Sequence, residues 1–269
     1  MKRILVILAG LAFTTFPIYL FLHRSVDLIE QPVILGHGGM GIQSIYPLNS
    51  AKSTKTAMKS GANGVELDVR MTKDGVLIAF HDSELKRAST CEGILEETLF
   101  SDIKNCESMT WLKSEPIESL PALLDLEVLQ NATLSLDLKL SENYSDEDLQ
   151  TLKSGLINLI SDNSDKHFLL ESTNRQLLDS LVPTKGNAEI LLNHSNADEA
   201  IEISLSAGYD GIIVEDDKIN SEQVISAHDK GLIVAVWGVG SVFDNREALL
   251  LNPDIIQTDD LRSMRRLLR

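Results

Sequence analysis

The stretch Gly64–Asp82, GVELDVRMTKDGVLIAFHD, contains two apolar runs joined by a short polar connection. In the first run Glu66, Asp68 and Arg70 alternate with apolar residues, so the three charged side chains share one face of the expected strand. The connection holds an Asp-Gly dipeptide, a tight-turn signal, and is too short for a helix. The stretch therefore predicts two strands joined by a hairpin turn.

After residue 30, similar apolar runs alternate with amphipathic stretches, many of which end at a glycine that begins the next connection. Repeated strand–helix units predict a parallel sheet covered by helices. Nine strands are expected, and the hairpin explains the excess over the eight of a (β/α)8 TIM barrel, a fold of about 250 residues. The expected strands are 32–36, 64–71, 76–80, 133–140, 167–172, 188–193, 211–215, 232–237 and 254–257, and the expected helices include 50–60, 145–161, 173–181, 197–207, 221–230 and 246–251.

The N-terminus is apolar. Residues 4–22 carry no charge and follow Lys2 and Arg3. Residues 1–25 are therefore expected to be a transmembrane anchor or a secretory signal peptide. Because the two basic residues tend to stay cytoplasmic, the rest of the chain is expected in the periplasm or the extracellular space.

The remaining chain, 30–269, is expected to form one α/β barrel with a poorly periodic insertion at about 84–130. Cys91 and Cys106 both fall in this insertion, and the sequence leaves open whether they form a disulfide or stay free thiols. The net charge of −16 argues against a nucleic-acid partner, which needs a basic surface. The sequence does not indicate an oligomeric state.

The first apolar run ends in a glycine-rich loop, VILGHGGMG at 33–41, whose glycines fit the dinucleotide fingerprint G-x-G-x-x-G. That fingerprint requires a helix to begin at the third glycine. Pro47 disfavours helix there, and Ser50 or the residue before it is the better helix start. A nucleotide-binding oxidoreductase is therefore the weaker interpretation, and His37 inside the loop becomes a candidate for catalysis.

Two strands place carboxylates on the expected inner face of the barrel. Glu66 and Asp68 stand two residues apart, and TLSLDLKL at 133–140 adds Asp137 and Lys139 in the same alternation. Buried charges are costly unless they bind something, and oxygen ligands of this kind suit Ca²⁺ or Mg²⁺. An internal Asp–Lys structural pair is the alternative for the second strand.

Three further candidate residues lie at or directly after the ends of expected strands. His37 and His81 each come directly after an apolar strand, and such positions at the C-terminal mouth of a barrel carry catalytic groups. Together they form a candidate acid–base pair. Trp237 ends the last long strand, as a core aromatic or as a pocket wall.

Taken together, these motifs resemble the glycerophosphodiester phosphodiesterase family. The resemblance runs in order along the barrel region and is most specific in the hairpin stretch. The matching segments are His37-Gly38-Gly39, Pro47-Leu48-Asn49-Ser50, Glu66-Leu67-Asp68-Val69, Thr72-Lys73-Asp74-Gly75, Phe80-His81-Asp82, Asp137-Leu138-Lys139, Trp237 and Thr258-Asp259.

The resemblance implies a TIM barrel that uses a divalent ion, Ca²⁺ or Mg²⁺, to hydrolyse a glycerophosphodiester to glycerol 3-phosphate and an alcohol. A glycerol hydroxyl attacks phosphorus while two histidines act as general base and acid. The implied roles fall on Glu66, Asp68 and Asp137 for the ion, on His37 and His81 for proton transfer, and on Lys139 for the charge of the phosphodiester.

Departures from the family pattern put the substrate in question. Gly38 stands where the family has an arginine, and Leu48 stands where it has a glutamate. Arg70 is the expected replacement for the missing phosphate contact. Asn49 and Trp237 complete the expected substrate-binding set.

Two alternatives remain open at this point. The third acid of the motif is Asp137 rather than glutamate, and Asp-x-Lys also resembles sphingomyelinase D. Phospholipase D-like cleavage of a lysophospholipid or sphingolipid is therefore one alternative. A non-catalytic barrel that binds phosphate esters is the other.

Overall fold

A computed structural model of the chain describes residues 25, 26, 28, 30–141 and 143–269. The expected anchor or signal peptide at 1–25 lies almost wholly outside these residues. Within the described part of the chain, every helix is too short or too polar to cross a bilayer.

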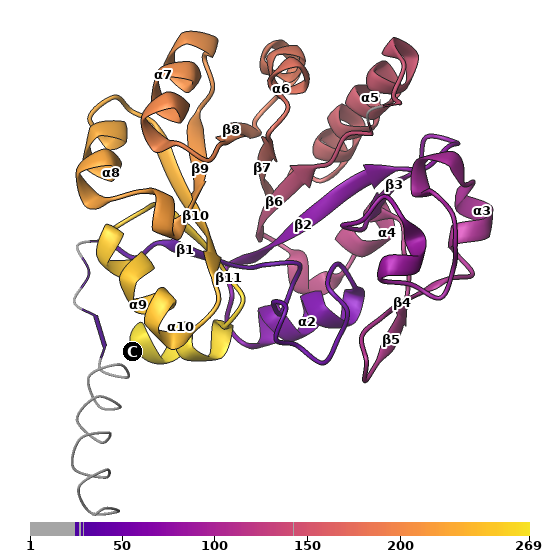
Figure 1. The fold of residues 1–269 in the computed structure, drawn as a ribbon, viewed down its shortest axis with the longest axis horizontal. Helices are drawn as coiled ribbons and strands as arrows, with labels where there is room; N and C mark the ends of the chain where they lie inside the picture. Colours follow the sequence, from indigo (N-terminus) through magenta and orange to yellow (C-terminus); the bar gives the residue numbers. More distant parts are fainter. Residues whose placement is uncertain (1–24, 27, 29, 142) are drawn as a thin grey trace, which may run out of the picture.

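Eight parallel strands close into a barrel, because the first strand pairs with both the second and the last. Helices lie outside the strands, and Figure 1 shows them around the barrel. This arrangement confirms the predicted (β/α)8 TIM barrel. The barrel strands are β1 Val33–Gly36, β2 Gly64–Met71, β6 Thr133–Leu138, β7 His167–Ser172, β8 Glu189–Asn193, β9 Gly211–Glu215, β10 Ile233–Val239 and β11 Ile255–Thr258.

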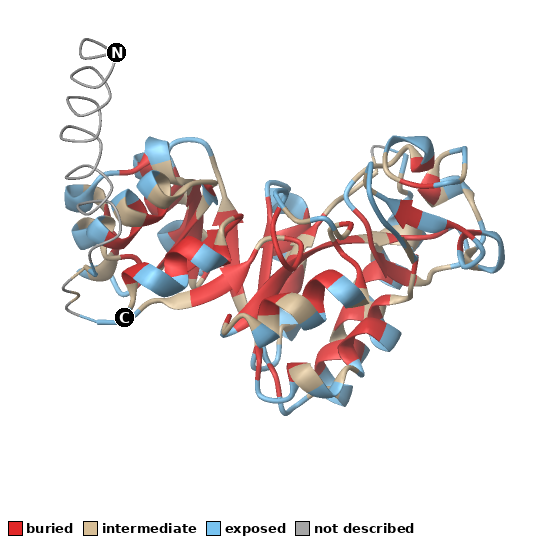
Figure 2. Cartoon of the chain, turned by 90° about the horizontal axis from the view of Figure 1, so that it is seen from below, coloured by how far each residue is buried: buried red, intermediate tan, exposed pale blue. Residues whose placement is uncertain are grey.

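The outer helices bury one face against the barrel and expose the other, as Figure 2 shows. Most begin at a side-chain cap, such as Ser50, whose hydroxyl accepts a hydrogen bond from the backbone N–H of Ser53. The helices are α2 Ala51–Lys59, α5 Asp146–Asp162, α6 Arg175–Leu181, α7 Ala197–Ala207, α8 Ser221–His228, α9 Val242–Leu251 and α10 Leu261–Leu267, with short 3₁₀ turns η4 Val182–Thr184 and η5 Asp216–Lys218.

The predicted hairpin is present. Strand β3, Leu77–Ala79, runs antiparallel to β2 at the edge of the sheet, after a turn in which Gly75 has a φ of +83°. β3 is therefore not a barrel strand, and the expectation that His81 follows the C-terminal end of one was wrong. The hairpin instead returns the chain to the mouth, where the backbone N–H of Phe80 donates to the carbonyl of Asp68.

The first part of the segment between β3 and β6 forms a small layer beside the barrel with its own apolar cluster, which includes Phe80, Ile103 and Cys106. Cys91 and Cys106 are joined there by a disulfide, with 5.7 Å between their Cα atoms. The elements of this layer are η1 Leu85–Arg87, η2 Leu95–Glu97, α3 Phe100–Ile103, β4 Glu107–Met109 and β5 Ser114–Pro116. The next two elements, α4 Leu120–Leu124 and η3 Glu127–Leu129, pack their buried leucines into the barrel core.

The barrel interior has an apolar lower layer near the N-terminal ends of the strands. Its members are buried and pack against one another. This layer closes the bottom of the barrel and leaves the C-terminal mouth for polar side chains. Its buried members are Leu35, Leu169, Leu191, Ile213, Ala235 and Ile255.

Candidate metal-binding and catalytic site

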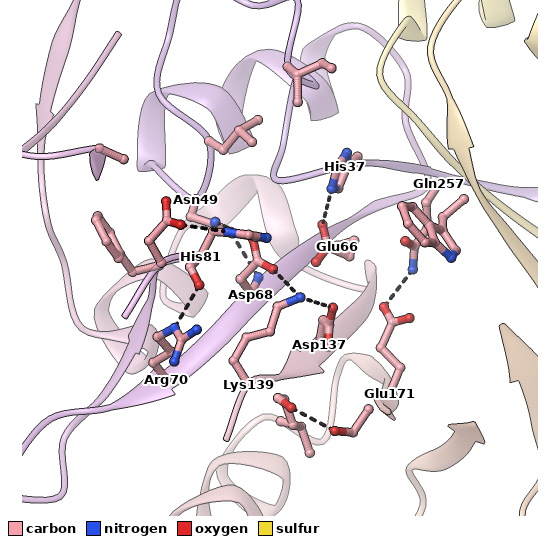
Figure 3. A pocket seen from close by; sticks show the side chains of 18 of the residues that line it. His37, Asn49, Glu66, Asp68, Arg70, His81, Asp137, Lys139, Glu171 and Gln257 are labelled. Carbon is pink, nitrogen blue, oxygen red and sulfur yellow. Dashed lines mark hydrogen bonds and ion pairs between the residues drawn. The ribbon is translucent and has the colours of Figure 1, made fainter. Parts of the chain in front are cut away.

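A cavity of about 800 Å³ opens at the C-terminal mouth of the barrel. All the side chains that the sequence predicted for the site line this cavity, and Figure 3 shows most of them facing it. These residues are His37, Asn49, Glu66, Asp68, Arg70, His81, Asp137, Lys139 and Trp237.

Three carboxylates meet at the floor of the cavity. Glu66 and Asp68 project from β2, and Asp68 pairs in register with Asp137 of β6. One oxygen of each lies within 4.8 Å of the other two. Burial, together with the charge of Asp68, raises the pKa of Glu66 well above its usual range, and burial also raises the pKa of Asp137. The cluster is thus an all-oxygen donor set of three close carboxylates, which fits a hard divalent cation.

Lys139 supplies part of the missing positive charge. Its Nζ lies 2.5 Å from Oδ2 of Asp137 and 3.2 Å from Oδ1 of Asp68. Burial alone would lower the pKa of Lys139, but the two carboxylates outweigh burial and raise it. The ammonium therefore stays charged beside the cluster and at the wall of the cavity. This position of the ammonium is compatible with the predicted substrate contact and also forms the alternative Asp–Lys pair.

His37 is held by a residue from the far end of the chain. Its Nδ1 lies 2.8 Å from Oδ1 of Asp259, directly after β11, and its Nε2 lies 3.9 Å from Oε2 of Glu66. Burial lowers the pKa of His37, but the hydrogen bond to Asp259 and the charges of Glu66 and Asp68 outweigh it and raise the pKa to about 10. The hydrogen bond to Asp259 fixes the ring so that Nε2 faces the carboxylates.

His81 lies on the other side of the carboxylates with a largely exposed side chain. Arg70 fixes its backbone, because the guanidinium Nε donates to the carbonyl of His81 at 2.8 Å. The same guanidinium pairs with the buried carboxylate of Glu96 at 2.5 Å. This geometry gives Arg70 a positioning contact to His81, and its expected contact to phosphate stays a prediction.

Asn49 supports the cluster from the loop before α2. Its Nδ2 donates to Oδ2 of Asp68 at 2.8 Å, and its Oδ1 accepts the backbone N–H of Asp68 at 3.1 Å. Asn49 holds this reciprocal pair from a left-handed backbone with a φ of 60°. The amide therefore orients a carboxylate, and its expected contact to substrate stays a prediction.

The positions that depart from the family pattern lie beside each other. The backbone N–H of Gly38 donates to Oε2 of Glu66 at 2.8 Å. A Cβ on Gly38 would stand 2.8 Å from the Cβ of Leu48, and the φ of +52° is strained for other residues. Leu48 thus fills the space next to residue 38 and makes this wall of the cavity apolar.

Three polar residues of the site, Glu171, Gln257 and Asp259, make contacts that the sequence did not predict. Glu171 of β7 is buried and accepts hydrogen bonds from Ser135 Oγ at 2.8 Å and from Gln257 Nε2 at 2.7 Å. HFLLES at 167–172 has three consecutive apolar residues and lacks the polar/apolar alternation that identified Asp137, so the sequence did not single out Glu171. Asp259 appeared only within a matching motif, and its partnership with His37 spans 222 positions of sequence.

A sequence profile described as the Glycerophosphoryl diester phosphodiesterase family matches residues 40–263. Among curated relatives, a glycerophosphodiester phosphodiesterase of Bacillus altitudinis is 30% identical over 107 residues, which is 38% of this chain and 43% of that protein. One from Bacillus subtilis is 32% identical over 103 residues, 38% of this chain and 35% of the relative. The aligned segments thus span less than half of either relative.

Solved structures resemble nearly the whole barrel. A phosphodiesterase from Oleispira antarctica, determined in complex with the product sn-glycerol-3-phosphate, superposes with a TM-score of 0.76 at 20% identity, covering 87% of this chain and 95% of that one. A glycerophosphodiester phosphodiesterase from Agrobacterium tumefaciens gives a TM-score of 0.72 at 22% identity, with 87% and 99% covered. At this identity the likeness establishes a shared fold.

Proposed function

This chain belongs to the glycerophosphoryl diester phosphodiesterase family, and from that premise we propose that it hydrolyses glycerophosphodiesters to glycerol 3-phosphate and an alcohol. The observation that supports this most is the placement of His37 and His81 around one buried triad of carboxylates in a single cavity. Glu66, Asp68 and Asp137 would hold a Ca²⁺ or Mg²⁺ ion, whose charge would neutralise the phosphodiester and offset the carboxylate charges.

The reaction proceeds in two displacements at phosphorus. In the first, the glycerol hydroxyl next to the phosphoester attacks phosphorus, and the bond to the leaving alcohol breaks. A cation on the three carboxylates would offset the charges that raise the pKa of His37 and so leave its Nε2 unprotonated. His37 then takes the hydroxyl proton at Nε2, and His81 gives a proton to the leaving oxygen. In the second, water opens the resulting cyclic phosphate, with His81 taking the proton of water and His37 returning its own.

Two contacts and the exposure of one side chain support this division of roles. Asp259 binds Nδ1 of His37, which leaves Nε2 for the substrate hydroxyl. His81 is exposed at the mouth, where a leaving alcohol departs to solvent. Lys139 keeps a positive charge beside the cluster, where it would stabilise charge that develops on the phosphoryl oxygens.

The test is an assay of the purified full chain on glycerophosphocholine, first with EDTA and then with added Ca²⁺ or Mg²⁺. We expect choline and glycerol 3-phosphate to appear only when an ion is present, and Glu66→Gln to lose this turnover. Release of phosphocholine would contradict the proposed bond cleavage. Binding of glycerol 3-phosphate with no turnover of any phosphodiester would instead favour the non-catalytic barrel.

We also infer that the barrel works outside the cytoplasm. The Cys91–Cys106 disulfide supports an oxidising compartment, and the apolar residues 4–22 support targeting to a membrane. Fusion of alkaline phosphatase after residue 269 should give an active reporter in bacterial cells. An inactive alkaline phosphatase fusion, with an active cytoplasmic reporter at the same position, would contradict this location.

A further inference from the structure

One side of the cavity mouth carries a set of exposed apolar side chains, which we call the apolar rim. It comes from two segments, the loop that follows β1 and the β4–β5 hairpin of the added layer. Trp111 at the hairpin tip is 90% exposed and Ile42 is 64% exposed. The rim consists of Ile42, Ile45, Met109, Trp111 and Leu112.

The two segments of the rim are fastened to each other and to the layer below. Thr110 Oγ1 donates to the carbonyl of Ile45 at 2.8 Å, which joins the hairpin tip to the β1 loop. The backbone N–H of Met109 donates to the carbonyl of Ala88 at 2.8 Å, close to the disulfide at Cys91. These two hydrogen bonds thus hold the segments that carry the rim in place, and such preorganisation favours binding.

The rim is continuous with the apolar wall of the cavity. Ile42 and Met109 belong to both, and Leu48 continues the wall down toward Glu66. Leu48 fills the place beside Gly38, the position without the arginine side chain of the family pattern. An apolar surface therefore runs from the floor of the site to the outer edge of the mouth, where exposed apolar area of this kind marks a binding site.

We propose that the apolar rim binds the hydrocarbon chain of a single-chain amphipathic phosphodiester, so that the substrate class is a lysoglycerophospholipid. This inference rests on the proposed function, because the same hydroxyl attack and the same histidines act on the head-group ester. A lysophospholipid acylated at one end of the glycerol keeps the hydroxyl next to the phosphoester. A second acyl chain would block that hydroxyl.

The overall reaction adds one water across the bond between phosphorus and the head-group oxygen. For lysophosphatidylcholine, the products are choline and an acylglycerol phosphate. The acyl chain stays on the glycerol half of the substrate and is untouched by the chemistry. The rim therefore contributes binding energy remote from the reacting atoms, and it distinguishes substrates by chain length.

The experiment measures kcat/KM of the purified full chain on glycerophosphocholine and on octanoyl and dodecanoyl lysophosphatidylcholine, each below its critical micelle concentration. We expect kcat/KM to rise by roughly two- to fourfold for each methylene that reaches the rim. The double variant Trp111→Ser with Leu112→Ser should lose about tenfold or more on the dodecanoyl substrate, and stay within about twofold of the wild type on glycerophosphocholine.

The matched control is Leu205→Ser with Ile225→Ser, which removes two exposed apolar side chains from α7 and α8 and should leave all three rates unchanged. A flat dependence on chain length would overturn the proposal, as would an equal loss on all substrates in the rim variant. A loss confined to substrate embedded in vesicles, with monomeric substrate unaffected, would also overturn it, because the rim would then bind a membrane surface.

A binding measurement separates this inference from the proposed function. Dodecylphosphocholine carries the chain and the phosphodiester but no hydroxyl to attack phosphorus. Below its critical micelle concentration it should bind one molecule per chain and shift tryptophan emission to the blue. Trp111→Ser should keep only the part of the shift that arises from Trp237 in the cavity. Such binding without turnover of any substrate would contradict the proposed hydrolysis and support chain binding at the rim. Turnover of glycerophosphocholine without such binding would contradict chain binding at the rim and leave the proposed hydrolysis intact.

Discussion

The lower and upper layers of the barrel interior stand on the same strands and differ completely in chemistry. On β7, Leu169 packs in the apolar lower layer, and Glu171, two residues further on, is buried at the floor of the cavity. On β11, Ile255 likewise lies in the apolar lower layer, and Gln257, two residues further on, contacts Glu171 in the upper layer. Because side chains alternate along a strand, a step of two residues keeps the direction and changes only the height in the barrel.

The two layers contribute to free energy in opposite directions. The lower layer removes apolar area from water and stabilises the fold. The upper layer buries carboxylates close together, which makes their ionisation unfavourable. The pKa values of Glu66, Asp137 and Glu171 are raised for this reason. The fold thus supports at one end of the barrel a charge cluster that would not be stable alone, and this division can be tested residue by residue.

The largest effect is expected at the mouth. His81→Ala should lower kcat by about 10² to 10⁴-fold, the usual contribution of a general acid, with an unchanged thermal midpoint because the side chain is exposed. Steady-state kinetics and calorimetry on glycerophosphocholine measure both. The control is His167→Ala at the opposite end of the barrel, where β7 begins. Equal kinetics in the two variants would remove His81 from the mechanism.

A substitution in the lower layer should reduce stability and leave catalysis unchanged. Leu191→Ala leaves a cavity in a fully buried site and should reduce the free energy of unfolding by about 2–5 kcal/mol, as measured by urea denaturation. The folded fraction should keep its kcat/KM. Leu205→Ala, on the exposed side of α7, is the control and should change stability by at most about 0.5 kcal/mol. A large loss of kcat/KM in folded Leu191→Ala would show that the layers are not separable.

Glu171, which stands above Leu169 on β7, should make the free energy of unfolding depend on pH. Burial and the charge of Asp137 raise its pKa from 4.5 to about 8, so the folded state keeps a proton that the unfolded state releases between those values. The contribution of Glu171 to the free energy of unfolding is therefore greatest below pH 4.5, and it declines as the pH rises toward 8.

Glu171→Gln removes that decline. In EDTA the variant should exceed the wild type by about 4 kcal/mol at pH 8, and the two should converge at pH 4.5. Urea denaturation at the two pH values measures the difference. The exposed Glu222→Gln should follow the wild type at both. A constant difference between Glu171→Gln and wild type across this range would contradict the account.

The smallest effect compares the two ends of β11, each of which carries a histidine–aspartate pair. Asp259→Asn, at the mouth, removes the charge that orients His37 and should lower kcat by about 10²-fold with little change in KM. Asp254→Asn, at the lower end, alters the matching pair with His228 and should leave kcat unchanged. Rates that fall equally in both variants would indicate a structural effect common to the strand.

Much of the fold and of the site was predictable because its signals are local. Alternation within β2 and β6 identified Glu66, Asp68 and Asp137, and an Asp-Gly turn identified the hairpin that carries His81. The added layer was predicted only as an insertion. Its strands have three residues each, too few to show a period.

Contacts between residues far apart in the chain could not be predicted from the sequence. Asp259 reaches His37 across the closure of the barrel, and Gln257 reaches Glu171 through its interior. Arg70 was expected at the phosphate because of its inward position, yet its Nη1 pairs with Glu96 of the added layer. Closure of the barrel and packing of that layer determine these partners, and neither leaves a periodic trace in the sequence.

The central claim is that the upper layer holds one divalent ion on three carboxylates, and calorimetric titration of the purified chain with Ca²⁺ and with Mg²⁺ tests it most directly. We predict one ion bound per chain, and affinity lower by about tenfold or more in Asp137→Asn, which removes one ligand and its charge. Unchanged affinity in Asp137→Asn, or a wild-type chain that binds neither ion, would contradict the account.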